Sequence, residues 1–265
     1  MAGSAETATV EVRGHRFTVD VSQPTHRRFW TEQLAAGWER ATLDFVERYA
    51  VAGAAFLDIG AWVGPFSLVA ASQGARVIAL EPDPVARAAL EANVRLNDLD
   101  IRVLASAFDA GGDGLSLHGG RRGFGASTTS AARKGGETVT VPTVTAADLA
   151  EMAGGGPAAI KIDIEAHEFA CAAAIADLRR RLNAPLHLSL HPRMLRRSFG
   201  WRRFFGGDRI VFERTLALLE GLDGVAIEAT DAPVAVDAEG LRARLLGAPG
   251  GVKNFDVVAT PISLG

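Results

Sequence analysis

The segment "FLDIGAWVGPFSL", residues 56–68, holds an apolar run that reaches a carboxylate and is then interrupted by two glycines. Burial explains the apolar residues, but a charged side chain at the end of a core strand is costly unless a partner stabilises it. Gly60 allows a sharp backbone turn, and Gly64 with Pro65 begins a helix whose free N–H groups favour polar ligands. The segment therefore predicts a strand, a glycine turn and a helix that leave room for a polar ligand.

The composition is that of a globular protein with a substantial core. Of 265 residues, 48% are hydrophobic and 22% charged, and the length suits one large domain. A net charge of -3 provides no general attraction to nucleic acid or anionic membranes, so we expect neither as a partner. The single cysteine, Cys171, favours a reducing, cytoplasmic setting. No segment approaches the roughly 18 consecutive apolar residues of a membrane span, and the amino end lacks the pattern of a secretory signal.

Short apolar strands alternate with helical patterns from about residue 55 onward. The expected strands cover residues 54–60, 75–81, 101–106, 158–164, 185–190, 224–229 and 254–261. The expected helices cover residues 64–74, 83–98, 166–181 and 208–220, and Asp83 with Pro84 is a typical helix start. This alternation predicts an α/β fold with a doubly wound, mostly parallel sheet and helices on both faces.

The remaining segments predict additions to that sheet. Residues 1–50 should form an N-terminal extension, with a hairpin over 7–21 and helical spacing over 24–50, which could serve as a homodimer interface or as a lid. Within the main domain, residues 51–265, the Gly-rich stretch near 109–137 predicts a loop insertion and 138–144 an extra strand. The arginines and aromatics near 192–209 predict a lid that could receive an anionic or aromatic acceptor.

The ends of the first two strands indicate a nucleoside site. Ligands of open α/β sheets bind beyond the carboxyl ends of the strands, where Asp58 and Glu81 fall, and a carboxylate such as Glu81 suits two ribose hydroxyls. Dinucleotide enzymes favour G-x-G-x-x-G, whereas here the pattern is D-x-G-x-x-x-G. A carboxylate beside the turn repels phosphate and suits the ammonium and sulfonium of S-adenosylmethionine. A purely structural turn, or an NAD-type oxidoreductase, is the alternative.

Four segments, "FLDIGAWVGPFSL", "VIALEPDPVARAALEANVRLN", "VPTVTAADL" and "IKIDIEAHE", resemble the FkbM-type S-adenosylmethionine-dependent methyltransferases. The resemblance covers about residues 50–192 and implies a Rossmann-like class I methyltransferase fold, with seven strands and an antiparallel last strand. It implies O-methylation of a hydroxyl on a small molecule, sugar or natural-product scaffold. The cofactor-binding residues that it implies are Asp58, Gly60, Ala61, Trp62, Gly64, Glu81, Pro82, Asp83, Ser106 and Ala107. The chain departs from the family pattern at Trp62, where Asn is frequent, and at Ala166, where Gly is usual.

Candidates for the acceptor side follow the fourth and fifth strands. Methyl transfer to a hydroxyl needs alignment, exclusion of water and, usually, removal of a proton. The candidate catalytic residues are Asp163, Glu165, His167 and His191. His191 could accept the proton because imidazole titrates near neutral pH, and Asp163 could be a base, a metal ligand or a helix cap.

We expect no resident metal, because an ion shared by Asp163, Glu165 and His191 would need more oxygen ligands than the sequence identifies. Cys171 lies in an apolar helical run and is predicted to be a small buried side chain rather than a nucleophile. A protein that binds S-adenosylmethionine without catalysis is a further alternative to an enzyme.

Overall fold

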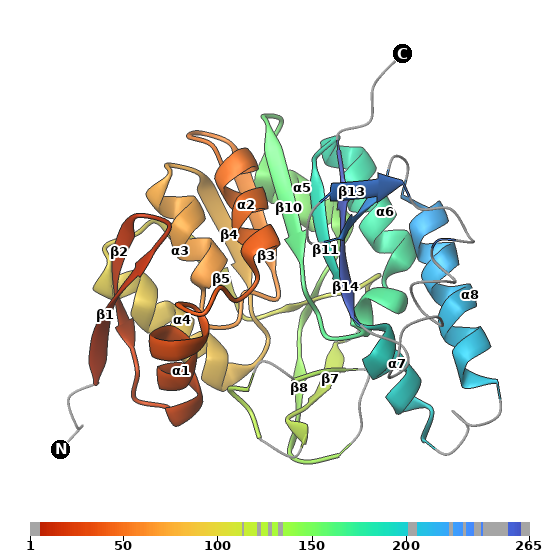
Figure 1. Cartoon of the computed structure of the whole chain (residues 1–265), viewed down its shortest axis with the longest axis horizontal. Helices are drawn as coiled ribbons and strands as arrows, with labels where there is room; N and C mark the ends of the chain where they lie inside the picture. Colours follow the sequence, from red (N-terminus) through yellow and green to blue (C-terminus); the bar gives the residue numbers. More distant parts are fainter. Residues whose placement is uncertain are drawn as a thin grey trace.

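A central sheet with helices on both faces dominates the computed structural model (Figure 1). The structure describes residues 6–112, 114–120, 123–126, 129–131, 135–200, 206–222, 225–229, 232–235, 240 and 254–260. The strand order is β13-β12-β14-β11-β10-β3-β4-β5. The strands are β3 (Ala55–Ile59), β4 (Arg76–Leu80), β5 (Ile101–Leu104), β10 (Ala158–Ile162), β11 (Leu186–Leu190), β12 (Val225–Ala229), β13 (Ala232–Ala235) and β14 (Phe255–Ala259).

The sheet is mostly parallel, as predicted. Strands β5, β4, β3, β10 and β11 run parallel, and β14 is inserted antiparallel between β11 and β12, which confirms the antiparallel last strand. The sheet of the described residues has 8 strands rather than the expected seven. The extra strand is β13, which extends the edge by pairing antiparallel with β12.

Two apolar layers bury the two faces of the sheet. All five residues of β3 are buried, with Leu57 in one apolar cluster and Phe56 in the other, because successive strand residues point to opposite faces. One layer contains α2 (Arg40–Tyr49), α3 (Pro65–Ser72) and α4 (Pro84–Leu96). The other contains α5 (Ala146–Ala153), α6 (Ala172–Leu182) and α8 (Gly207–Glu220). This arrangement confirms the doubly wound fold, and no described helix has the length and apolar character to cross a membrane.

The N-terminal segment forms the expected hairpin, β1 (Thr7–Val12) and β2 (His15–Asp20), which lies beside α4 (Figure 1). The spacing over residues 24–50 predicts helix throughout, but the structure has α1 (Pro24–Arg28), a π-helix (Phe29–Gln33) and then α2. The chain turns between them because Gly37 and Glu39 adopt left-handed conformations, with φ of +88° and +45°. This turn brings Glu39 to the ends of the sheet strands.

Two small sheets form at and around the insertion, and Figure 1 shows one of them, β7 with β8, below the central sheet. Strand β6 (Ala107–Phe108) pairs with β9 (Thr143–Val144), and β7 (Leu115–His118) pairs with β8 (Thr138–Val141). The single extra strand expected over 138–144 is therefore two strands, divided at Pro142, which has no N–H for a continuous ladder.

Two further segments differ from expectation. The helix expected from residue 166 begins only at Ala172, after a 3₁₀ turn (His167–Phe169), because Glu165 and Ala166 have φ of +54° and +75°. A left-handed residue explains why glycine is usual at position 166. Helix α7 (Pro192–Ser198) covers the first part of the expected lid, whereas Trp201, Arg202, Arg203, Phe204 and Phe205 lie outside the described residues.

Candidate functional site

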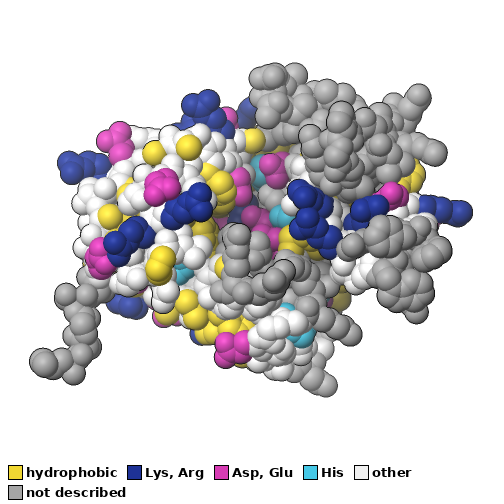
Figure 2. Space-filling model, turned by 60° about the horizontal axis from the view of Figure 1, so that its bottom comes forward, with side chains coloured by type: hydrophobic (Ala, Val, Ile, Leu, Met, Phe, Trp, Pro, Cys, Tyr) yellow, Lys and Arg dark blue, Asp and Glu magenta, His cyan; other side chains and the backbone are white. Residues whose placement is uncertain are grey.

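A cavity of about 290 Å³ lies at the carboxyl ends of β3, β4 and β10. Figure 2 shows acidic, basic and histidine side chains gathered around a hollow on this side of the molecule. The sequence-predicted residues that line the cavity are Gly60, Ala61, Trp62, Glu81, Pro82, Asp83, Ser106, Ala107, Asp163, Glu165, His167 and His191. Lining residues that sequence reasoning missed include Trp38, Glu39, Phe66, Phe108, Thr129, Ser130 and Lys161.

Asp58 does not line the cavity but lies behind its wall. Its side chain is fully buried, with Oδ1 3.1 Å from Lys161 Nζ and Oδ2 accepting a hydrogen bond of 2.6 Å from Ser67 Oγ. Burial lowers the pKa of Lys161, but Asp58 and Asp163 raise it more, so the pKa lies above its ordinary value. Asp58, which the sequence placed among the cofactor-binding residues, is therefore paired with Lys161 and does not reach the cavity surface.

Both glycines of the turn adopt a positive φ that favours glycine, and Gly60 also lies against the backbone of Asp163. Gly60 has φ of +82°, and a Cβ there would lie 1.9 Å from the backbone oxygen of Asp163. Gly64 has φ of +89°, and a Cβ there would lie 2.4 Å from Leu90 Cδ1. Gly60 thus lets the end of β10 approach the turn, while Gly64 starts α3 from a position that does not line the cavity.

Glu81 ends β4 as a buried carboxylate on the cavity wall. Its Oε2 accepts a hydrogen bond of 2.6 Å from the Trp62 N–H, and its Oε1 accepts one of 2.8 Å from the Asp83 N–H. Burial raises the pKa of Glu81 to about 8, although the hydrogen bonds from Asp83 and Trp62 act in the opposite direction. Each carboxylate oxygen has a second lone pair, so the group can still accept hydroxyl donors.

The backbone conformation of Trp62 explains why Asn is frequent at this position in FkbM-type enzymes. Its φ is +49°, a left-handed conformation in which Asn is favoured over most residues. The indole Nε1 donates a hydrogen bond of 3.0 Å to the carbonyl of Gly125, and the ring packs 4.5 Å from that of Phe29, centroid to centroid. Bulky residues rarely adopt this backbone conformation, and the contacts of the indole ring with Gly125 and Phe29 help to stabilise it here.

Asp83 caps α4, as predicted, and also holds the insertion. Its Oδ1 accepts hydrogen bonds from the N–H groups of Val85 and Ala86. Its Oδ2 accepts hydrogen bonds of 2.7 Å from the Gly125 N–H and 2.6 Å from Thr129 Oγ1. One carboxylate therefore fixes both a helix and a loop at the cavity, a second role that the sequence did not indicate.

His191 lies among three carboxylates at the other end of the cavity. Its Nδ1 lies 3.2 Å from Glu168 Oε1, and its Nε2 lies 3.5 Å from Asp163 Oδ1 and 3.8 Å from Glu165 Oε2. Burial lowers the pKa of His191, but the hydrogen bond and charge of Glu168, with Asp163 and Glu165, raise it to about 10. A pKa of about 10 favours a protonated ring at neutral pH, which pairs with these carboxylates and leaves no lone pair to accept a hydroxyl proton.

The ligand atoms of Asp163, Glu165 and His191 lie within 4.8 Å of one another, close enough to share a metal ion. A protonated imidazole has no lone pair to offer a metal, and its charge already offsets the neighbouring carboxylates. We therefore interpret these residues as an ion-pair cluster.

Glu39 is an acidic residue of the cavity wall that the sequence did not identify. It comes from the N-terminal segment, immediately before α2, and Thr42 Oγ1 lies 3.4 Å from its Oε2. Burial, followed by the charge of Asp163, raises the pKa of Glu39 well above its ordinary value, although Lys161 lowers it. No motif distinguishes Glu39 from other charged residues of the segment, but Gly37 could have indicated the turn.

His167 lies on the cavity wall but its Nε2 contacts Asp109 Oδ1 at 3.2 Å rather than the His191 cluster. Asp109 also accepts a hydrogen bond of 3.4 Å from the Sγ of Cys171, which is buried as predicted. Burial and the charge of Asp109 raise the pKa of the Cys171 thiol, which disfavours a nucleophilic role.

Residues 7–112 match the model of the TRM5/TYW2 methyltransferase domain. The matched range includes the hairpin, the glycine turn, Glu81 and Asp83, but not the His191 cluster. No curated protein sequence matches the chain. The match does not identify the FkbM-type family.

The fold is similar to solved structures at low sequence identity. A protein of Clostridium thermocellum assigned as an rRNA methylase is 11% identical, with 85% of this chain and 96% of that chain covered and a TM-score of 0.48. The T. thermophilus 16S rRNA N2 G1207 methyltransferase, solved with AdoMet and guanosine, is 14% identical, with 99% of this chain and 52% of that chain covered and a TM-score of 0.48. The chain thus spans about half the length of the second protein, and likenesses at this level carry no argument about its acceptor.

The domain match and the cavity at the strand ends agree on the class of protein. The chain is an S-adenosylmethionine-dependent methyltransferase, and S-adenosylmethionine is its cofactor.

Proposed function

We propose that the chain transfers a methyl group from S-adenosylmethionine to a hydroxyl oxygen of a small molecule or sugar. The observation that carries this proposal is the cluster of carboxylates around protonated His191 at one end of the cavity. A hydroxyl must lose its proton as the new C–O bond forms, and a carboxylate held in a partly buried site can receive it. Asp163 is our choice for this role, because its backbone adjoins the Gly60 turn and its Oδ1 faces His191.

The other end of the cavity fits the cofactor. Glu81 presents two carboxylate oxygens with free lone pairs, which suits the two ribose hydroxyls. Pro82, Ala107 and Phe108 provide apolar surface on the same wall, which suits a flat adenine ring. When bound, the cofactor supplies an electrophilic methyl group. The chain's own residues position the acceptor and receive its proton.

One feature supports a small acceptor, and another supports an anionic group on it. The "IKIDIEAHE" segment, which carries the resemblance to FkbM-type enzymes, provides Asp163 and Glu165 of the cluster. Helix α7 begins directly after His191 and presents exposed Arg193 and Arg197, while Arg196 pairs with Asp208. Arginine side chains near the site would attract phosphate or carboxylate groups on the acceptor. We further propose a cytoplasmic setting, because the chain has a single cysteine and so no intrachain disulfide.

The proposal is tested by the fate of a labelled methyl group. The full chain is incubated with methyl-labelled S-adenosylmethionine and either a cell extract of small molecules or total RNA, and the fractions are separated before counting. We expect label in the small-molecule fraction and none in RNA. Label in RNA would contradict the proposed acceptor, and label in neither would favour a protein that binds the cofactor without catalysis.

A further inference from the structure

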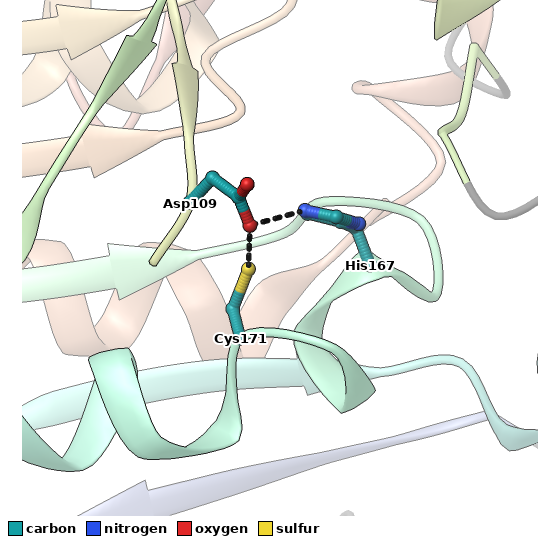
Figure 3. A group of neighbouring side chains, drawn as sticks. All are labelled: Asp109, His167 and Cys171. Atoms are coloured by element: carbon teal, nitrogen blue, oxygen red, sulfur yellow. Dashed lines mark hydrogen bonds and ion pairs between the residues drawn. The ribbon is translucent and has the colours of Figure 1, made fainter. Parts of the chain in front are cut away.

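A group of side chains close enough to share a metal ion lies beside the cavity, apart from the His191 cluster. Figure 3 shows Asp109, at the end of β6, with its carboxylate between the ring of His167 and the sulfur of Cys171. Its Oδ1 lies 3.2 Å from His167 Nε2 and 3.4 Å from Cys171 Sγ. Two segments of the chain supply the three residues. Asp109 follows β6, while His167 lies in the 3₁₀ turn after β10 and Cys171 lies at the start of α6.

These separations match those around a tetrahedral zinc ion. With Zn–O and Zn–N bonds of about 2.0 Å and a Zn–S bond of about 2.3 Å, tetrahedral angles place O and N about 3.3 Å apart, and O and S about 3.5 Å apart. The two measured separations, 3.2 and 3.4 Å, are close to these values, and all three ligand atoms lie within 4.8 Å of one another. The ligands would need no large rearrangement to receive an ion.

The chemistry of the ligands indicates which ion would bind. The pKa of the Cys171 thiol is raised in the metal-free protein, so an ion would have to displace the thiol proton to solvent as it binds. The resulting thiolate, with an imidazole and a carboxylate, forms a mixed set of soft and hard donors, which suits Zn²⁺ better than Mg²⁺ or Ca²⁺. His167 also lines the cavity, so that an ion could reach the group from there. We propose that Asp109, His167 and Cys171 form a binding site for a divalent transition-metal ion of the zinc type, with three protein ligands. This inference does not depend on the identity of the methyl acceptor.

The single cysteine makes the site directly observable. Because the chain has only Cys171, any thiolate-to-cobalt charge-transfer absorption must arise from this residue. The full chain, reduced and free of metal, is titrated with Co²⁺ while the near-ultraviolet and visible spectra are recorded. We expect a charge-transfer band that saturates at one Co²⁺ per chain, with visible bands typical of tetrahedral coordination, and that is abolished by Zn²⁺.

Matched variants separate this site from other binding. Cys171→Ser should remove the band, and Asp109→Asn and His167→Gln should each weaken Co²⁺ binding at least about tenfold. A double variant, Asp163→Asn with Glu165→Gln, should retain the band, because that cluster contains no sulfur. Circular dichroism checks that each variant is folded. The absence of a band in the unmodified chain would overturn the proposal, and so would a band of equal affinity in folded Asp109→Asn and His167→Gln.

Discussion

The Nδ1 of His191 lies 3.2 Å from Glu168 Oε1, and the same oxygen accepts a hydrogen bond of 2.7 Å from the backbone N–H of His191. Glu168 is fully buried and comes from the 3₁₀ turn after β10, so this pair joins the ends of β10 and β11. With Asp163 and Glu165, this contact raises the pKa of His191 to about 10, which favours the protonated imidazole at neutral pH. We therefore propose that another residue accepts the proton of the acceptor.

Stability should depend on pH through His191. Burial opposes the charge, but Glu168, Asp163 and Glu165 raise the folded-state pKa from 6.5 to about 10. A raised pKa contributes stability that is fully present below the unfolded-state value and is lost as pH rises through the folded-state value. The free energy of unfolding should therefore fall between pH 6.5 and about 10.

Denaturant unfolding across this range checks the expectation, with His191→Gln as the comparison. The variant should be less stable by about 3–5 kcal/mol at pH 6.5, because Glu168 loses its buried partner. It should also lack the decline attributed to His191. The same decline in both proteins would contradict a charged His191.

Asp163→Asn should lower kcat about 100-fold or more, because general-base catalysis contributes about 10²–10⁴. The Kd for S-adenosylmethionine should change little, because Asp163 is assigned to the acceptor. Steady-state kinetics and calorimetry measure the two effects separately. Glu39→Gln is the matched control: burial already favours the neutral form of Glu39, so its amide should reduce kcat much less. Equal losses in the two variants would argue against Asp163 as the base.

Above pH 8, where Glu81 is ionised, Glu81→Gln should weaken cofactor binding about tenfold or more, because hydrogen bonds to a charged group contribute about 1.5–3 kcal/mol. The glutamine side chain has one oxygen that accepts hydrogen bonds. Its NH₂ group is a donor and cannot replace the second accepting oxygen of the carboxylate. Calorimetry with S-adenosylhomocysteine measures the loss without turnover. Adenine binding measured alongside should be nearly unaffected, since adenine has no ribose, and an unchanged Kd for S-adenosylhomocysteine would contradict the ribose assignment.

Gly60→Ala should destabilise the fold by about 3 kcal/mol or more, because the new Cβ would meet the backbone of Asp163. Gly14→Ala is the matched control. Gly14 has φ of +79°, close to the +82° of Gly60, but a Cβ there has nothing within 4 Å. The control should cost only the conformational strain of about 1–2 kcal/mol. Thermal unfolding compares them, and similar shifts would show that the close approach at Gly60 does not matter.

The fold could be predicted from the sequence because its signals are local. Alternating apolar runs identified the parallel sheet, and Asp83 with Pro84 identified the start of α4. The ion pair between Asp58 and Lys161 could not be predicted without knowing which strand lies beside β3. Lys161 is the polar residue in an otherwise apolar strand and lies directly opposite Asp58 in the β3–β10 register.

The electrostatics of the site could not be predicted, because they depend on residues brought together by turns. Glu39 reaches the cavity through a left-handed backbone conformation, and Glu168 reaches His191 across a 3₁₀ turn that was expected to be helix. Sequence reasoning therefore placed His191 correctly on the cavity wall but assigned its protonation state from the isolated side chain.

The central claim is methyl transfer to oxygen, and the bond that forms is its most direct test. A reaction with S-adenosylmethionine carrying a ¹³C-labelled methyl group, followed by purification and NMR of the methylated product, identifies the atom that receives the carbon. We predict a labelled methyl ether on a small molecule or sugar, with the signal lost in Asp163→Asn. A labelled N-methyl group, or a labelled base in RNA, would contradict the account.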